Sequence, residues 1–441
     1  MRLGQSINKA LDGRLSFTGL TKSFNLALTG KWLLLSLLVG AVAGLGAAAF
    51  QYTLDFVLAL SWSSIIGLDP TGPAGEAHLV HFARRHDFVP WLLLLVPAVG
   101  GLISGVIVFR FAPEAEGHGT DSAIGAYHEK DGFIRRRVPL VKLVASAITI
   151  GTGGSAGREG PIAQIGAGFG SFLATALKLS KRERRLLLAA GLGAGVAAIF
   201  RAPLAGALFA AEVMYSEAEF EHDVLVPATM ASITSYSVFG LLFGFGHLFA
   251  DTAHLAFTNP LELAPYLLLA FVTAGGAMLF SWAFYRITDW FSSLAIPKVF
   301  RPALGGLMTG AVGMSLYYAI GDTDVLAVMG AGYGLLQKAI SSPYTLGSSG
   351  LLILAVVAVG KILTTGLSIG SGGSGGVFGP SMVIGGALGG VVGVLFHQLW
   401  PEVVQQPGAY VVVGMAGFFA AAANTPVSTV IMVSELTGNY Q

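Results

Sequence analysis

Apolar runs separated by short polar segments make up most of the chain, and this pattern predicts a membrane protein built from α-helices. Several runs are shorter than the roughly 20 residues that a helix needs to cross a bilayer, and glycines interrupt many of them. Because irregular backbone at membrane depth must be buried in protein or line a cavity, we expect re-entrant helices whose ends lie in the protein interior. The predicted apolar segments are 32–60, 90–112, 138–150, 162–177, 186–214, 224–250, 263–285, 302–320, 349–369, 377–399, 408–423 and 425–436.

Basic residues gather in some polar segments and are missing from others. Lysine and arginine are found in segment 1–31 and in the loops 135–137, 181–185 and 286–301, whereas the loops 251–262 and 400–407 contain neither. Because cytoplasmic loops are enriched in these residues, the positive-inside rule predicts that segment 1–31 is a cytoplasmic N-terminal segment. Segments 138–150 and 162–177 then form a hairpin entered from the cytoplasm, and 349–369 and 377–399 form one entered from outside.

The composition supports a polytopic membrane protein rather than a soluble domain with an anchor. Hydrophobic residues make up 54% of the 441 residues and charged residues only 11%, whereas soluble domains carry about 25% charged residues. The 61 glycines favour close helix packing and broken helices. A net charge of +1 indicates no nucleic-acid partner, and the absence of cysteine excludes disulfides and thiolate metal sites. No metal site or cofactor is expected.

An internal repeat supports the inverted arrangement of the two hairpins. Lys142–Phe172 aligns with Lys361–Val391 at a constant offset of 219, with 12 identities in 31 positions. Gly191–Glu212 aligns more weakly with Gly414–Glu435, at an offset of 223. Inverted repeats place a substrate site at their interface near mid-membrane, with broken helix ends directed at it.

The repeat also predicts the domain organisation. We expect one transmembrane domain over 32–441, made of inverted repeats at roughly 32–250 and 263–441. The fold class is therefore an all-α polytopic membrane protein, with two inverted-topology repeats whose re-entrant helices meet at mid-membrane.

The stretch Gly151–Pro161 (GTGGSAGREGP) is the strongest candidate for a broken helix end. Five of its eleven residues are glycine, so no ordinary helix runs through it, and Pro161 favours the first turn of a new helix. Such an N-terminus binds anions through its free amides, and an ionisable residue at membrane depth, here Glu159, is a functional candidate. In the repeat this stretch aligns with Gly370–Pro380 (GSGGSGGVFGP), which places Glu159 opposite Phe378.

Five segments resemble the CLC family of chloride channels and proton–chloride antiporters, in its order and spacing. Three of them, PEAEGHGTD, GREGP and GGVFGP, match the family's anion-filter segments, and the resemblance covers nearly the whole chain. It implies a fold in which the two repeats meet at an anion filter. The segments are PEAEGHGTD (Pro113–Asp121), GREGP (Gly157–Pro161), RAPLAGALFAAE (Arg201–Glu212), GGVFGP (Gly375–Pro380) and ELTGNYQ (Glu435–Gln441).

The resemblance implies roles for the matching residues. Glu159 matches the gating glutamate, whose carboxylate occupies an anion position when ionised and swings away when protonated or displaced. Phe378 is expected to form the opposite part of the gate, and Lys142 matches a buried lysine that adds positive potential. The anion would contact Gly117, His118, Gly119, Arg158, Glu159, Gly160, Val377, Phe378 and Gly379, largely through backbone amides.

The chain departs from the family's pattern at three places. His118 replaces the usual central-site serine; its imidazole still offers a donor, and its titration would make anion binding depend on pH. Val213 stands where proton-coupled members carry an internal proton-transfer glutamate, which leaves a passive channel or another proton path, through Glu159 and Glu212 with water. The chain stops at Gln441, where the family continues with roughly two more helices, including a tyrosine that contacts the central anion.

Three functions are compatible with these features. The leading prediction is transport of chloride or a similar small anion, gated by Glu159 and coupled to protons. The alternative is a passive chloride channel gated by voltage or pH, which Val213 favours. An intramembrane enzyme is a remote alternative, because no nucleophile–base or HExxH motif is evident. The resemblance also implies a homodimer in a lipid bilayer, and the composition suggests a bacterial inner membrane.

Overall fold

The computed structural model describes residues 26–76, 80, 82–215, 222–257, 259–341 and 350–440. Most of the predicted cytoplasmic segment 1–31, and Gln441, lie outside these residues. Within the described ranges the regular structure is helical, apart from two isolated β-bridges. Seven of the described helices are long and apolar enough to cross a membrane. The predicted all-α membrane fold is confirmed.

The helices follow the predicted apolar segments closely, with two additions and one division. The short helices α5 and α13 lie outside the predicted apolar segments. The predicted segment 186–214 is divided into α8 and α9 at Arg201, whose φ is 55°. In chain order the helices are α3 (Leu26–Leu58), η1 (Ala59–Ile66), α4 (Leu92–Phe111), η2 (Pro113–Ala115), α5 (Thr120–Glu129), α6 (Arg137–Gly151), α7 (Glu159–Ala176), α8 (Lys181–Phe200), α9 (Pro203–Glu212), α10 (His222–Phe243), η3 (Pro260–Glu262), α11 (Leu263–Ser293), η4 (Lys298–Phe300), α12 (Arg301–Ile320), η5 (Thr323–Val328), α13 (Tyr333–Ser341), α14 (Gly350–Gly370), α15 (Phe378–Leu399), α16 (Pro407–Ala423) and α17 (Pro426–Thr437).

Both predicted hairpins are present, and each turns at a glycine-rich segment. Helix α6 ends at Gly151 and α7 begins at Glu159, while α14 ends at Gly370 and α15 begins at Phe378. Gly153 has a φ of 108° and its repeat equivalent Gly372 has a φ of 96°, a backbone conformation that glycine adopts without strain. The chain can therefore reverse inside the protein and present the first turns of α7 and α15 to each other.

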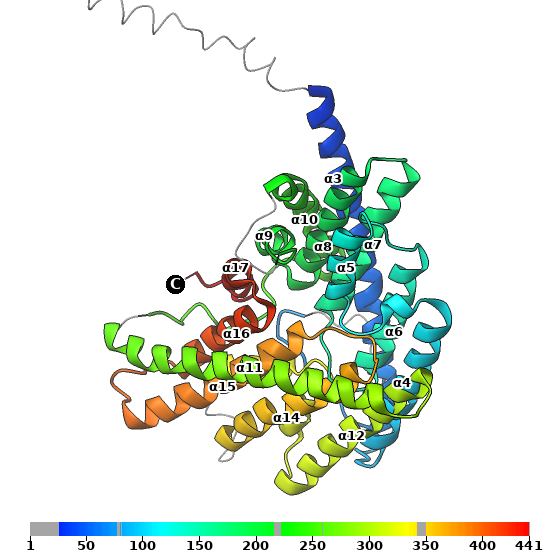
Figure 1. Ribbon diagram of the computed structural model, residues 1–441. Helices are drawn as coiled ribbons and strands as arrows, with labels where there is room; N and C mark the ends of the chain where they lie inside the picture. Colours follow the sequence, from blue (N-terminus) through cyan, green and yellow to red (C-terminus); the bar gives the residue numbers. More distant parts are fainter. Residues whose placement is uncertain are drawn as a thin grey trace, which may run out of the picture.

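The helix contacts repeat between the two halves. Helix α3 packs against α6, α7 and α8, and α11 packs in the same way against α14, α15 and α16. The pairs α4–α6, α7–α8 and α8–α9 have counterparts in α12–α14, α15–α16 and α16–α17. Figure 1 shows α11 lying across α14, α15 and α16, while α3 runs beside α7 and α8. Two inverted-topology repeats are thus combined in one bundle.

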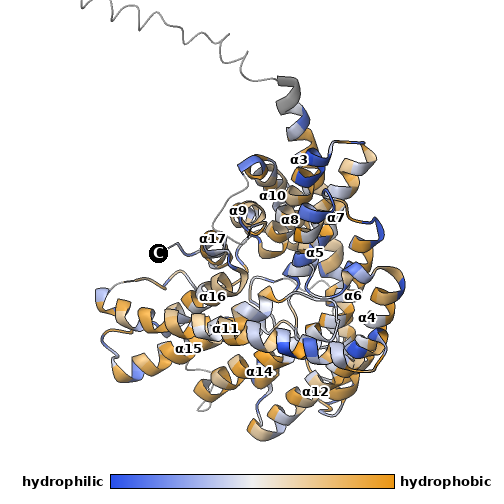
Figure 2. Ribbon diagram, in the orientation of Figure 1, coloured by the Kyte–Doolittle hydropathy of each residue, from blue (hydrophilic) through white to orange (hydrophobic). Residues whose placement is uncertain are grey.

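The outer helices carry a hydrophobic surface. Orange, hydrophobic residues line α12, α14 and α15 in Figure 2. On α11 the exposed side chains include Leu267, Phe271, Met278 and Trp282, each more than half exposed. In α7 and α8, by contrast, the stretches 159–168 and 186–200 are completely buried. The apolar exterior suits a lipid bilayer, and the buried broken ends of α7 and α15 lie within the protein.

Candidate functional site

The two glycine-rich turns meet between the N-termini of α7 and α15. The amide of Gly157 donates to the carbonyl of Gly376, and the amide of Gly376 donates back to the carbonyl of Gly157, each at 2.7 Å. These two glycines are equivalent in the repeat with offset 219. The reciprocal pair fixes the two helix N-termini side by side at the centre of the bundle, where their first-turn amides lack partners within the helices.

Two further turns are hydrogen-bonded to these glycine-rich segments. Gly117, in the turn before α5, exchanges hydrogen bonds of 3.2 Å with the backbone of Gly373 and Gly375. Gly330, in the turn before α13, makes the corresponding bonds to Gly153 (3.1 Å) and Ala156 (3.3 Å). The segments 117–120 and 330–333 therefore occupy equivalent positions in the two repeats, a third equivalence that the sequence alignment did not detect.

A fully buried lysine supports each of these turns. The ammonium of Lys142 donates to the Gly117 carbonyl at 2.5 Å, and that of Lys361 donates to the Gly330 carbonyl at 3.0 Å. No ion pair with either lysine occurs among the described residues. Each ammonium thus engages turn carbonyls and places positive charge beside the centre, an arrangement that suits an anion.

The carboxylate of Glu159 lies between the two helix ends. Its side chain is fully buried, its Oε1 accepts a hydrogen bond from the Tyr333 hydroxyl, and its Oε2 accepts one of 3.2 Å from the amide of Gly379. A carboxylate at the N-terminus of α15 occupies the place where the helix dipole and free amides favour an anion. In this structure, the carboxyl group of Glu159 occupies that position.

Arg158 directs its side chain away from Glu159. Its guanidinium makes a buried ion pair with Glu76, donates to Gln51 Oε1 at 2.8 Å, and lies 5.6 Å from the centroid of the Tyr333 ring. The ion-pair partner of Arg158 in this structure is therefore Glu76 and not the adjacent Glu159. The Arg158 side chain instead ties the start of α7 to α3 and to the loop that follows η1.

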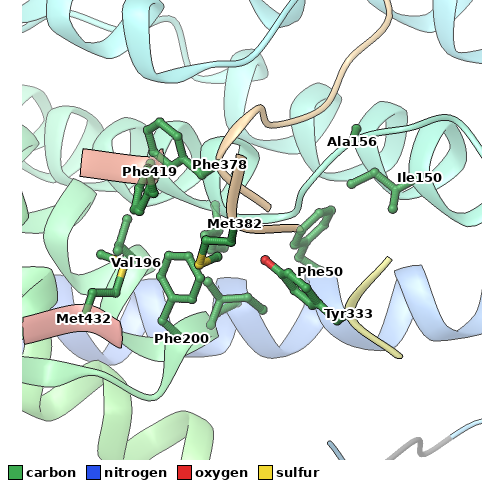
Figure 3. Close-up of a cluster of buried hydrophobic side chains, with 14 of the residues drawn as sticks. Phe50, Ile150, Ala156, Val196, Phe200, Tyr333, Phe378, Met382, Phe419 and Met432 are labelled. Carbon is green, nitrogen blue, oxygen red and sulfur yellow. The ribbon is translucent and has the colours of Figure 1, made fainter. Parts of the chain in front are cut away.

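Phe378 occupies the position equivalent to Glu159 on the other helix end. Its ring contacts those of Phe209 at 5.5 Å and Phe419 at 4.9 Å between centroids, and the residue is only 6% exposed. Figure 3 shows Phe378 beside Phe419, with the Tyr333 side chain in the same buried cluster. The titratable and the aromatic halves of the predicted gate are thus both at the repeat interface.

Two cavities approach the helix ends, one beside each of the paired turns. The Tyr333 cavity has a volume of about 160 Å³ and the His118 cavity one of about 470 Å³. Phe378 lines the His118 cavity, whereas Arg158 and Tyr333 line the other. Glu159 lies between Tyr333 and the start of α15, because its carboxyl group accepts from the Tyr333 hydroxyl and from the amide of Gly379, the residue after Phe378. The lining residues include Gln51, Asp55, Glu76, Arg158, Tyr333 and Lys338 in the Tyr333 cavity, and His118, Thr120, Asp121, Val213, Tyr285 and Phe378 in the His118 cavity.

The predicted anion-contact residues are all near this centre. Gly117, His118 and Gly119 form the turn before α5, while Arg158 to Gly160 and Val377 to Gly379 form the starts of α7 and α15. The two parts touch, because a β-carbon at Gly160 would lie only 2.2 Å from the His118 carbonyl oxygen. The His118 imidazole, however, contacts Asp121 through Nε2 at 3.0 Å. The anion contacts themselves stay a prediction.

Glu212 and Glu435 have matching structural roles. The Glu212 carboxylate accepts hydrogen bonds from the amides of Val427 (3.0 Å) and Ser428 (2.8 Å) at the start of α17. In return, the Glu435 carboxylate accepts a bond of 2.8 Å from the amide of Ala205 at the start of α9. Each glutamate ends one helix and caps the other, which satisfies amides that have no helical partner. A proton path through Glu212 remains a prediction.

Tyr333, Glu76 and Lys361 were missed from the sequence. Tyr333 holds Glu159 from 174 positions away, and Glu76 pairs with Arg158 from 82 positions away, so no local pattern connects them. Lys361 had a detectable signal, since it is aligned with Lys142 in the repeat. A signal for Tyr333 also existed in the matching glycine spacing of Gly117-His118-Gly119 and Gly330-Ala331-Gly332, each of which precedes a short helix.

Comparisons with known proteins agree with this geometry. The family described as voltage gated chloride channel matches residues 100–441. A protein of Ralstonia nicotianae named as a ClcB-like chloride channel protein is 32% identical over 355 residues, 80% of this chain and 79% of the relative. The H⁺/Cl⁻ exchange transporter ClcA of Cronobacter sakazakii is 29% identical over 416 residues, 93% of this chain and 82% of the relative. A crystal structure of a slow cyanobacterial Cl⁻/H⁺ antiporter superimposes with a TM-score of 0.77 at 23% identity, covering 93% and 90% of the two chains, and so shares the fold.

Proposed function

Because the chain belongs to the voltage-gated chloride channel family, we propose that it exchanges chloride for protons across a membrane, with Glu159 as the gate. One observation carries the role of Glu159: its buried carboxylate is bound by the Gly379 amide and the Tyr333 hydroxyl between two cavities. The carboxylate stands where a permeating anion would stand, so anion passage requires it to leave.

The exchange follows from competition for this position. Chloride approaching from either cavity displaces the ionised carboxylate, because both are anions and the same donors serve each of them. Protonation of Glu159 removes its charge and weakens its hold on the Gly379 amide, which frees the position in a second way. The Glu159 carboxyl group alternates between a state displaced by chloride and a protonated state. This alternation couples the movement of chloride to that of protons. Amides and helix dipoles bind chloride without a direct cation contact, so release remains possible.

Phe378 controls the other side of the same passage in this proposal. It lines the His118 cavity and packs between Phe209 and Phe419, so an anion entering from that cavity must pass the ring. The buried ammonium groups of Lys142 and Lys361 keep the central potential positive for that anion. The proposal also includes contacts between the anion and Gly117, Gly119, Gly160 and Val377.

The orientation and assembly are also proposals. The basic loops 135–137 and 181–185 favour a cytoplasmic position for the His118 side, with the N-terminus on the same side, in a bacterial inner membrane. Apolar side chains on helices α9, α10 and α17, including Leu204, Val226 and Val430, are exposed in the single chain and favour a homodimer through these helices.

Flux in reconstituted liposomes tests the exchange against a passive channel. The purified protein is placed in chloride-loaded liposomes with equal pH on both sides, and chloride is diluted outside. We expect chloride efflux to drive proton uptake that continues against a proton gradient, at a fixed ratio, and to persist when a potassium ionophore clamps the membrane potential. Chloride efflux without uphill proton movement would establish the channel instead, and no flux of either ion would refute anion transport.

Tyr333→Phe tests how Glu159 is held. The hydroxyl donates to a compact, charged carboxylate oxygen, which accepts a stronger hydrogen bond than the larger chloride ion. Its removal should weaken the carboxylate as a competitor and raise chloride affinity about fivefold, equal to roughly 1 kcal/mol. Calorimetric titration of the purified protein with chloride measures this change.

Tyr410→Phe is the matched control for that substitution. Tyr410 is also fully buried, but its ring stacks on Tyr266 and its hydroxyl has no hydrogen-bond partner among the described residues. Chloride affinity should stay at the wild-type value in this variant. An unchanged or weaker affinity in Tyr333→Phe would contradict the role of its hydroxyl in holding Glu159.

A further inference from the structure

Proton coupling needs a titratable group on the His118 side of the gate, and position 213 does not supply the glutamate that the family resemblance implies. Val213 lines the His118 cavity at the position where the family resemblance leads one to expect a glutamate, and a valine side chain binds no proton. Glu212, the neighbouring carboxylate, is 3% exposed and caps α17 through both of its oxygens. Among the described residues, the titratable side chains that line this cavity are His118, Asp121, Tyr215 and Tyr285.

His118 and Asp121 form a pair at the mouth of this cavity. The imidazole Nε2 lies 3.0 Å from Asp121 Oδ2, and their side chains are 19% and 68% exposed. The other ring nitrogen, Nδ1, is buried and has no hydrogen-bond partner among the described residues. The pair therefore has one end open to solvent and one end directed into the protein. An imidazole titrates near neutral pH and carries a proton on either nitrogen.

The pair also lies next to the gate. The His118 carbonyl packs against Gly160, the residue that follows Glu159. The His118 ring contacts Phe284 at 6.2 Å between centroids, and both side chains line the cavity with Phe378, whose neighbour Gly379 binds the Glu159 carboxylate. His118 thus contacts the first turn of α7, which begins at Glu159.

We infer that His118, paired with Asp121, is the internal proton-transfer site of this protein and replaces the carboxylate absent at position 213; the inference rests on the exchange proposed above. A proton released by Glu159 reaches Nδ1 through water and converts the ring to imidazolium. The Asp121 carboxylate balances that charge, and the Nε2 proton then leaves to water beside the exposed end of Asp121. One proton enters the ring and one leaves it, and the reverse order moves a proton toward Glu159.

The surrounding groups allow both states of the ring. The Lys142 ammonium binds the neighbouring Gly117 carbonyl from α6 and opposes a second positive charge, whereas Asp121 on α5 favours it. Tyr285 from α11 and Tyr215, which follows α9, face the same cavity. The ring thus has a basic group on α6 and an acidic group on α5 beside it.

The test measures the proton-to-chloride ratio in liposomes for His118→Gln and Asp121→Asn. Glutamine keeps a donor for Asp121 but does not titrate, so the ratio should fall at least tenfold; Asp121→Asn should lower it severalfold. Adding Val213→Glu to His118→Gln should restore most of the ratio, because a carboxylate then lines the same cavity. Between about pH 5 and 8, the proton flux of the wild type should vary, and this variation should vanish in His118→Gln.

Two controls match the residue types. His128, also on α5, donates through Nε2 to the Met214 carbonyl at 2.6 Å, and Asp131, in the loop beyond α5, pairs with Lys181 and Arg185 of α8. His128→Gln and Asp131→Asn should keep the wild-type ratio. An unchanged ratio in His118→Gln, with a wild type that moves protons uphill, would overturn this inference alone. A wild type that passes chloride without protons would overturn the exchange itself, and with it this inference.

Discussion

Glu159→Gln is expected to abolish chloride-driven proton movement while chloride still crosses the membrane. The side chain is fully buried at the meeting point of the two repeats, between the cavities. An amide of the same shape carries no exchangeable carboxyl proton, so the coupled cycle loses its central carrier. It also lacks the negative charge that competes with chloride at the Gly379 amide, so chloride affinity should rise about tenfold, or roughly 1.4 kcal/mol.

The same liposome assay and chloride titration measure both consequences. Glu159→Ala, which removes the side chain as well as the charge, should lose proton coupling to the same extent and should alter chloride flux strongly. Glu129→Gln is the control, because that glutamate lies at the exposed end of α5. Proton uptake that persists in Glu159→Gln, or chloride flux that is unchanged in both Glu159 variants, would contradict the assignment of Glu159 as the gate.

The central part of the fold could be predicted because it is encoded locally and then repeated. The glycines of 151–161 break a helix wherever they occur, and their counterparts in 370–380 break another at a fixed offset. That alignment was enough to place Glu159 opposite Phe378. The structure adds the physical link, since the equivalent residues Gly157 and Gly376 exchange hydrogen bonds directly.

The partners of Glu159 and Arg158 could not be predicted in the same way. Tyr333 and Glu76 lie on other elements, and only tertiary packing brings the Tyr333 hydroxyl to the Glu159 carboxylate. The family resemblance predicts a tyrosine in helices that would follow Gln441, so it does not indicate Tyr333. The paired turns at 117–120 and 330–333 share little beyond two glycines, too weak a signal for an alignment.

Glu212 has the chemistry of a proton carrier, but its carboxylate serves as a helix cap in the structure. Its position beside Val213 suggested a substitute proton carrier. In the structure its carboxylate caps α17, and Glu435 caps α9 in return, so the end of each repeat is fastened to the other. A sequence alignment records that these glutamates are equivalent, but their reciprocal contact depends on the inverted packing of the repeats.

Gly376→Ala is expected to slow transport of both ions about 100-fold. A β-carbon at this position would lie 2.8 Å from the Gly157 carbonyl oxygen and 2.8 Å from the Gly160 amide nitrogen. Both are backbone atoms of the opposite hairpin, so the start of α7 must move away from that of α15. Overpacking of this kind costs about 1–3 kcal/mol of stability. A displacement near 1 Å at a site that depends on aligned donors lowers rates about 100-fold.

Gly275→Ala separates this effect from any general cost of the substitution. Gly275 faces outward on α11 and a β-carbon there meets no atom within 4 Å, so alanine should stabilise the helix by up to about 1 kcal/mol. Thermal unfolding in detergent should show a lower transition temperature for Gly376→Ala and an equal or higher one for Gly275→Ala, whose fluxes should match the wild type. Normal chloride and proton fluxes in a folded Gly376→Ala protein would mean that transport does not require the close pairing of the two glycine turns. Because Gly157 faces the Gly379 amide as well as Gly376, Gly157→Ala should reproduce the loss from the other repeat.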